Sequence, residues 1–154
     1  MLIVIAEKEE LKLVEELGYG DEQILITGVG GMNVIEALKD IPRDTEILNI
    51  GYCGSNHYEV GTRLQIIAVG TNHEKAQFTE RIKPLNVKLA EKYDDTAYCY
   101  TSTDFVEKTN KTDPCVFDME LAFIRAIMPN TRAIKVVSDK LSHEQYKTKI
   151  KGEL

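Results

Sequence analysis

The sequence predicts a single α/β domain, covering residues 1–154, with a mostly parallel or mixed central sheet flanked by helices. Short aliphatic runs typical of buried strands alternate with stretches whose apolar residues recur at helical spacing. In the first fifty residues this alternation places strands at 2–6, 23–27 and 46–50 and helices at 7–17 and 32–39. Because parallel strands need helical crossovers, this order favours a three-layer α/β fold. A chain of 154 residues is long enough to bury one proper core.

The second half of the chain gives weaker signals, except at two helices. Asp118 stands at the N-cap position of a helix expected at 118–128, which Pro129 follows. Ser142 opens the last helix, and Gln145 three residues later completes a capping-box pattern. The other predicted elements are strands at 63–69, 96–101, 115–117 and 132–137, a helix at 87–93, and a polar loop with some helix at 71–84.

Residues 47–55, with the sequence ILNIGYCGS, predict the floor of a ligand site. The apolar run ends at Gly51 and Gly54, which indicates a buried strand followed by a tight loop. In open α/β sheets, ligands bind at the carboxyl ends of such strands. We therefore expect glycine here to let the backbone turn with a positive φ and to let a ligand approach the main chain closely.

Composition limits the partners and the compartment. The net charge of −6 argues against a nucleic-acid partner, and no apolar run approaches the length of a membrane span. The three cysteines, Cys53, Cys99 and Cys115, form no CxxC pair, and no signal peptide is recognisable. These features predict reduced thiols in a cytoplasmic protein. The three histidines lack metal-ligand spacing, so we expect no metal site.

The glycine loop at 28–31 follows a strand and opens a helix, as a dinucleotide-binding fingerprint does. However, Asn33 stands where that motif has its third glycine, and the residues around Leu48 and Asn49 are not the acidic ribose ligand. A close-packed turn is the favoured interpretation, and nicotinamide binding is the alternative.

Three acidic residues lie near the predicted ends of strands: Glu10, Glu120 and Asp139. Because parallel strands end at one edge of a sheet, these carboxylates could converge beside Gly51 and have divergent pKa values there. The alternative is that Glu10 and Glu120 only favour helix N-termini through the backbone dipole. Asp139 is harder to explain in that way, because Ser142 is a better cap for the next helix.

Five short motifs occur in an order that resembles the nucleoside phosphorylase / nucleosidase superfamily. They are AxxEE after the first strand, TGVGxxN after the second, NxGxxGS at the third, DME before a helix and VVSD at the end of the last strand. The resemblance runs from about residue 2 to residue 142. It is strongest toward methylthioadenosine/S-adenosylhomocysteine nucleosidase and futalosine hydrolase. It implies a phosphorylase/hydrolase-like three-layer fold and hydrolysis of the N-glycosidic bond of a purine nucleoside, without metal or cofactor.

The resemblance also implies residue roles. Asp139 would be the general acid at N7 of the purine, and Glu10 would position or deprotonate the attacking water. Glu120 would accept hydrogen bonds from the ribose hydroxyls. The remaining implied substrate-binding residues are Met119 under the sugar, Phe105 against the purine, and Gly51, Tyr52 and Ser138 around them. For Phe105, an ordinary place in the core is an equal alternative.

Departures from the family pattern leave two other functions open. Asn49 stands at a position that resembles an arginine site in the phosphorylases, which need cations around inorganic phosphate. Hydrolysis is therefore preferred, and phosphorolysis is the third choice. Tyr52 replaces a small residue, Lys135 replaces an arginine, and the segment 69–98 is abbreviated. A catalytically degenerate nucleoside-binding or interaction protein is therefore the second choice. The resemblance further implies a homo-oligomer, a dimer.

Overall fold

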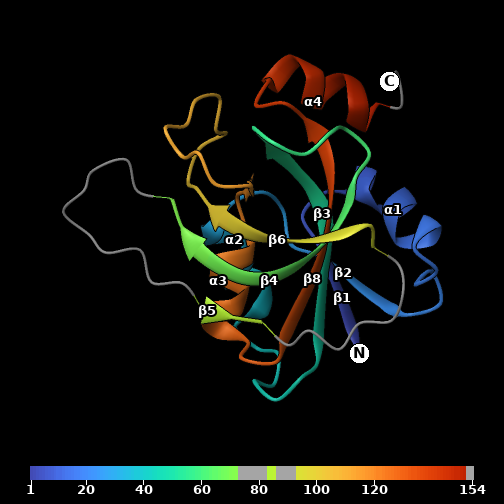
Figure 1. The fold of residues 1–154 in the computed structure, drawn as a ribbon. Helices are drawn as coiled ribbons and strands as arrows, with labels where there is room; N and C mark the ends of the chain where they lie inside the picture. Colours follow the sequence, from blue (N-terminus) through green and yellow to red (C-terminus); the bar gives the residue numbers. More distant parts are fainter. Residues whose placement is uncertain (73–82, 86–92, 152–154) are drawn as a thin grey trace.

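A mixed sheet occupies the centre of the computed structural model, which describes residues 1–72, 83–85 and 93–151 (Figure 1). Within these ranges the sheet has eight strands. They are β1 (Leu2–Ile5), β2 (Gln23–Ile26), β3 (Ile47–Ser55), β4 (Arg63–Thr71), β5 (Lys83–Pro84), β6 (Asp95–Thr101), β7 (Cys115–Asp118) and β8 (Thr131–Asp139). The helices are the 3₁₀ turn η1 (Lys8–Glu10), α1 (Leu11–Glu16), α2 (Gly31–Leu38), α3 (Leu121–Ile127) and α4 (His143–Ile150).

Part of this sheet closes on itself. β3 pairs parallel with β8, β8 antiparallel with β4, β4 parallel with β6, β6 parallel with β7, and β7 antiparallel with β3. β1 and β2 extend the sheet from β3 in the parallel direction. The carboxyl ends of β1, β3 and β8 therefore lie at the same edge of the sheet.

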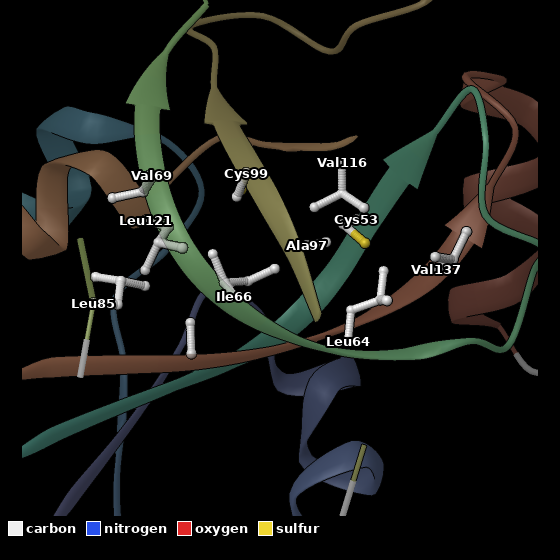
Figure 2. Packing of buried hydrophobic residues seen from close by; sticks show 11 residues of the cluster. Cys53, Leu64, Ile66, Val69, Leu85, Ala97, Cys99, Val116, Leu121 and Val137 are labelled. Carbon is white, nitrogen blue, oxygen red and sulfur yellow. The ribbon is translucent and has the colours of Figure 1, made fainter. Parts of the chain in front are cut away.

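The closed part of the sheet holds one of the hydrophobic clusters. Leu64 and Ile66 of β4, and Ala97 and Cys99 of β6, belong to it at the two-residue period of a strand. Figure 2 shows this cluster, in which side chains from neighbouring strands are joined by Leu121 of α3 and by Leu85, which follows β5. The cluster comprises Cys53, Leu64, Ile66, Val69, Leu85, Ala97, Cys99, Val116, Leu121, Ala133 and Val137.

The helices cover the strands from different sides (Figure 1). Leu13 and Val14 of α1 join a cluster with Ile3 and Ile5 of β1. α2 and α3 join residues of β1 and β3 in another cluster on the other side of the sheet. α4 contains no fully buried residue and lies across the end of β8, where Tyr146 and Ile150 pack against the cluster beside α1.

Most predicted elements are confirmed, with ends shifted by a few residues, but two predictions are wrong. The helix expected at 118–128 begins only at Leu121, because Asp118 is the last residue of β7. The loop expected after Ile50 is strand: β3 continues to Ser55, since β8 pairs with it as far as Gly54 and β7 pairs with Gly54 and Ser55. Most of the loop predicted at 71–84 and of the helix predicted at 87–93 lie outside the described residues, whereas Lys83–Pro84 forms β5.

The start of α4 confirms the predicted cap in part. The Ser142 hydroxyl accepts a hydrogen bond from the Gln145 amide at 3.2 Å. The reciprocal half of the capping box does not form, because the Gln145 side chain accepts from the Lys140 amide at 2.7 Å. Across the described ranges, none of the helices is long and apolar enough to cross a membrane.

Candidate functional site

A cavity of about 260 Å³ opens at the carboxyl ends of β1, β3, β7 and β8. It brings together most of the site residues predicted from the sequence, which come from distant parts of the chain. Those lining it are Glu10, Tyr52, Phe105, Met119, Glu120, Ser138 and Asp139. Gly51 does not line the cavity, but it lies directly beside Glu10.

Glu10 is buried and is held by backbone amides. Its Oε1 accepts hydrogen bonds from the amides of Ala6 at 2.9 Å and Glu7 at 3.1 Å, and its Oε2 accepts from Tyr52 at 2.8 Å. Burial nevertheless raises the pKa of the Glu10 carboxyl, although these bonds and Lys135 act in the opposite direction. The carboxyl is therefore fixed in position and more basic than an exposed glutamate.

Gly51 is needed for close approach, not for an unusual backbone angle. It lies within β3 and is absent from the glycines with positive φ, so that part of the prediction is wrong. A Cβ atom at this position would lie 2.7 Å from Oε2 of Glu10 and 3.3 Å from Nζ of Lys135. The missing side chain leaves the space that both head groups occupy.

Asp139 ends β8 in a similar arrangement beside Gly54. A Cβ atom at Gly54 would lie 2.8 Å from its Oδ1. Oδ2 accepts from the Ser138 hydroxyl at 2.7 Å, and Oδ1 accepts from the Ser142 amide at 3.2 Å. Burial raises the pKa of the Asp139 carboxyl despite these bonds. A carboxyl that retains its proton more strongly is suited to donate it to a leaving group.

Glu120 precedes α3 and reaches across to the glycine loop. Its Oε2 accepts a hydrogen bond from the Gly30 amide at 2.8 Å, and a φ of 90° at Gly30 orients that amide. Burial, with the nearby Asp118 charge, raises the pKa of Glu120 to about 8. The loop itself is closed by the Asn33 side chain, which donates to the Val29 carbonyl at 2.7 Å.

Asp118 and Lys135 form a buried ion pair that the sequence reasoning missed. Nζ of Lys135 lies 3.0 Å from Oδ2 of Asp118, which also accepts from the Leu121 amide, and Oδ1 accepts from the Thr101 hydroxyl at 2.5 Å. Burial raises the pKa of Asp118, but Lys135 and these bonds outweigh it and hold the value below its usual range. A lysine within the apolar strand segment 132–137 was the signal available in the sequence.

Tyr52 does not fill the cavity. Its backbone amide donates a hydrogen bond to Glu10, while its ring belongs to the hydrophobic cluster that contains Leu13 and Val14 of α1. Nζ of Lys12 lies 5.9 Å from the ring centre. Cys53, the next residue, is buried, and that burial raises the pKa of its thiol. The thiol therefore stays protonated and unreactive.

Aromatic side chains form one wall of the cavity. The Phe105 ring centre lies 4.8 Å from that of His143 and 5.5 Å from that of Tyr146, both on α4. The Tyr146 hydroxyl donates to Oε2 of Glu7 at 2.8 Å, which joins α4 to the residues after β1. The cavity therefore combines an aromatic wall with a carboxylate floor. Over the residues described, no group of three or more His, Cys, Asp or Glu side chains forms a metal site.

Comparison with known proteins identifies the fold. No family model matches the chain, and a search of curated proteins gives no match. Among solved structures, Helicobacter pylori 5′-methylthioadenosine/S-adenosylhomocysteine nucleosidase is similar with a TM-score of 0.75 and 11% identity, over 99% of this chain and 91% of that one. Futalosine hydrolase of the same organism gives 0.74 and 12%, over 99% and 91%. The Neisseria meningitidis nucleosidase gives 0.72 and 13%, over 97% and 91%.

These similarities cover nearly the whole chain at very low identity. They bear out the architecture that the ordered motifs implied: one α/β domain with a mixed sheet between helices. The chain therefore has the fold of the methylthioadenosine/S-adenosylhomocysteine nucleosidases and of futalosine hydrolase.

Proposed function

We propose that this protein is a nucleosidase that hydrolyses the N-glycosidic bond of a purine nucleoside. The observation that carries the proposal is the meeting of Glu10, Glu120 and Asp139 in one cavity with a carboxyl floor and an aromatic wall. The fold supports it: the Neisseria meningitidis nucleosidase was solved with methylthio-immucillin-A, and a variant of the Helicobacter pylori enzyme holds 5′-methylthioadenosine in its active site.

In this proposal Asp139 is the general acid. Cleavage of the glycosidic bond leaves negative charge on the purine, which a proton delivered to N7 neutralises. The raised pKa of the buried Asp139 carboxyl supports that role, and the Ser138 hydroxyl at 2.7 Å orients the group.

Glu10 and Glu120 act at the sugar. Glu10, fixed by three amides, accepts the proton of the water that attacks C1′, so that the water adds across the broken bond. Glu120 hydrogen-bonds the ribose hydroxyls, with Met119 beneath the sugar. A protonated Glu120 can donate one such bond and accept another, and its pKa of about 8 supports this.

Phe105 supplies an aromatic face for the purine. It lines the cavity and is only partly buried, and the rings of His143 and Tyr146 lie beside it at inclined angles of 58° and 47°. Planar bases pack well on such surfaces.

Hydrolysis is favoured over phosphorolysis by the charge of the cavity. The lining that the structure describes contains no lysine or arginine that could bind inorganic phosphate, and the ammonium of Lys135 is already paired with Asp118. Asn49, at the position of the phosphorylase arginine, is buried and donates to the Val4 carbonyl at 2.9 Å.

We also propose a homo-oligomer, a dimer, in the cytoplasm. Four apolar side chains in the segment 26–35 are unusually exposed for their type: Ile26, Val29, Met32 (80%) and Ile35. Such a patch is typical of an interface. The three free, buried cysteines are consistent with a reducing compartment. Sedimentation of a monomer at micromolar concentration would refute the oligomer.

The test measures free base after incubation with methylthioadenosine, adenosine, inosine or futalosine. Asp139→Asn should lower base release from the best substrate by about 10²- to 10⁴-fold, the usual contribution of a general acid. The matched control is Asp113→Asn, an exposed aspartate outside the cavity, which should keep full activity. Equal activity of the two variants contradicts the proposed role of Asp139.

The same assay separates the two alternatives. Base release that depends on added phosphate indicates a phosphorylase. Thermal stabilisation by a nucleoside without product indicates a binding protein; a ligand at a hundred times its dissociation constant adds about 2.7 kcal/mol. The position of the Tyr52 ring, packed against α1, removes one of the reasons for the degenerate alternative.

A further inference from the structure

A second hollow, of about 350 Å³, lies between α1, the end of α4 and the strands β3, β4 and β8. Tyr52 lines both hollows: its ring packs toward α1, and its backbone amide donates a hydrogen bond to Glu10. None of the proposed catalytic carboxyls lines the second hollow. It is therefore a separate feature of the fold.

The sheet register explains why cationic and apolar groups meet there. Val136 of β8 pairs with Tyr52 of β3 on one side and with Arg63 of β4 on the other. Directly paired residues project from the same face of a sheet. Arg63, Val136 and Tyr52 therefore form a row across three adjacent strands, with Leu13 of α1 above it.

Three cations surround this row: Lys12, Arg63 and Lys149. All three are partly buried, although the chain as a whole is acidic, with a net charge of −6. Nζ of Lys12 donates to the carbonyls of Lys149 at 3.3 Å and Ile150 at 3.2 Å, which fixes it at the end of α4. Within the described part of the chain, none of the three forms an ion pair.

The nearby acids do not neutralise these cations. Glu16 lies on the rim and is exposed. Asp94 accepts a hydrogen bond from the backbone amide of Arg63 at 2.9 Å, which leaves the guanidinium available. Gln65 lies two residues after Arg63 on β4, so its side chain projects from the same face of the sheet. Its Nε2 is a buried donor without a hydrogen-bond partner among the described residues. Among the residues that line the hollow, the Arg63 guanidinium is therefore a donor that the nearby acids leave available.

We propose that this second hollow binds a phosphoryl group, independently of the nucleoside cavity. The Arg63 guanidinium presents paired donors that match phosphate oxygens, and Lys149 adds a second positive charge. Leu13, Leu17 and Val136 provide an apolar floor that suits the organic part of a phosphate monoester. The proposal does not depend on nucleosidase activity, and its test needs no turnover.

The test is isothermal calorimetry at pH 7 and low ionic strength, with inorganic phosphate, ribose 5-phosphate and ribose as probes. Saturable binding of either phosphate compound, without binding of ribose, supports a phosphoryl site, and the tighter of the two identifies the source. Arg63→Gln should weaken that binding about tenfold, which corresponds to ~1.4 kcal/mol. Lys149→Gln should weaken it as well.

Arg43→Gln is the matched control, because it removes the same charge from an exposed position outside the hollow. It should bind phosphate as the unaltered protein does, and circular dichroism should show that every variant is folded. Equal binding by Arg63→Gln, or an equal loss in Arg43→Gln, overturns the site. So does competition between phosphate and a nucleoside, which would put the anion in the other cavity. None of these results bears on base release.

Discussion

The end of β7 and the start of α3 carry two buried carboxyl groups with opposite behaviour. Asp118 and Glu120 are two residues apart and at most 9% exposed. The pKa of Asp118 is held below its usual range, whereas that of Glu120 is raised to about 8. Both groups are almost fully buried, and burial raises the pKa of each, so the opposite directions come from their partners.

Lys135 makes the difference. Its ammonium lies 3.0 Å from Asp118, whereas the hydrogen bond recorded for the Glu120 carboxyl comes from the Gly30 amide. One buried cation can compensate one carboxylate fully, and the other carboxyl then retains its proton. The fold thus keeps a fixed charge at Asp118 and an exchangeable proton at Glu120, both in the lining of one cavity.

Lys135→Met should remove the cause of the pKa difference between Asp118 and Glu120, and it should have the largest effect on stability. It leaves Asp118 buried without its partner, which costs about 3–5 kcal/mol of unfolding free energy. Urea denaturation measures the loss. Adding Asp118→Asn should recover part of it, because the uncompensated charge is then gone.

The control is the surface pair of Lys39 and Glu36, which are 2.7 Å apart and largely exposed. Lys39→Met should cost at most about 1 kcal/mol, since solvent screens that pair. Comparable losses in Lys135→Met and Lys39→Met would show that the buried pair is not what holds this region together.

Much of the fold follows from local patterns, but the charge arrangement does not. The aliphatic runs predict the strands, and the shared edge of parallel strands predicts that Glu10, Glu120 and Asp139 approach one another. Whether Lys135 pairs with Asp118, Glu10 or Glu120 depends on distances set by the whole sheet. Likewise, β3 continues through Gly51 because β8 pairs with it, a long-range effect that local glycine preferences cannot reveal.

Gly51→Ala tests the third carboxyl near Lys135, that of Glu10. The new Cβ would lie 2.7 Å from Oε2 of Glu10 and force it away from the Tyr52 amide. Overpacking of this kind costs about 1–3 kcal/mol, and base release should fall with it. Gly20→Ala is the control, because its Cβ would make only an ordinary 3.4 Å contact with Glu15. Equal stability of the two variants would mean that Glu10 moves freely.

Glu120→Gln tests the raised pKa of Glu120 through the pH dependence of the unfolding free energy. Between the unfolded pKa near 4.5 and the folded value of about 8, the folded state holds a proton that the unfolded state has lost. Stability should therefore fall as pH rises through this window, by at most about 1.4 kcal/mol per pH unit for one proton. Glutamine cannot titrate, so the variant should show a flatter dependence of stability on pH in urea denaturation from pH 5 to pH 8.

The slope should not vanish, because burial also raises the pKa values of Glu10 and Asp139. Glu22→Gln, at an exposed position, should retain the original slope; if Glu120→Gln retains it too, the proton at the cavity wall belongs to another group.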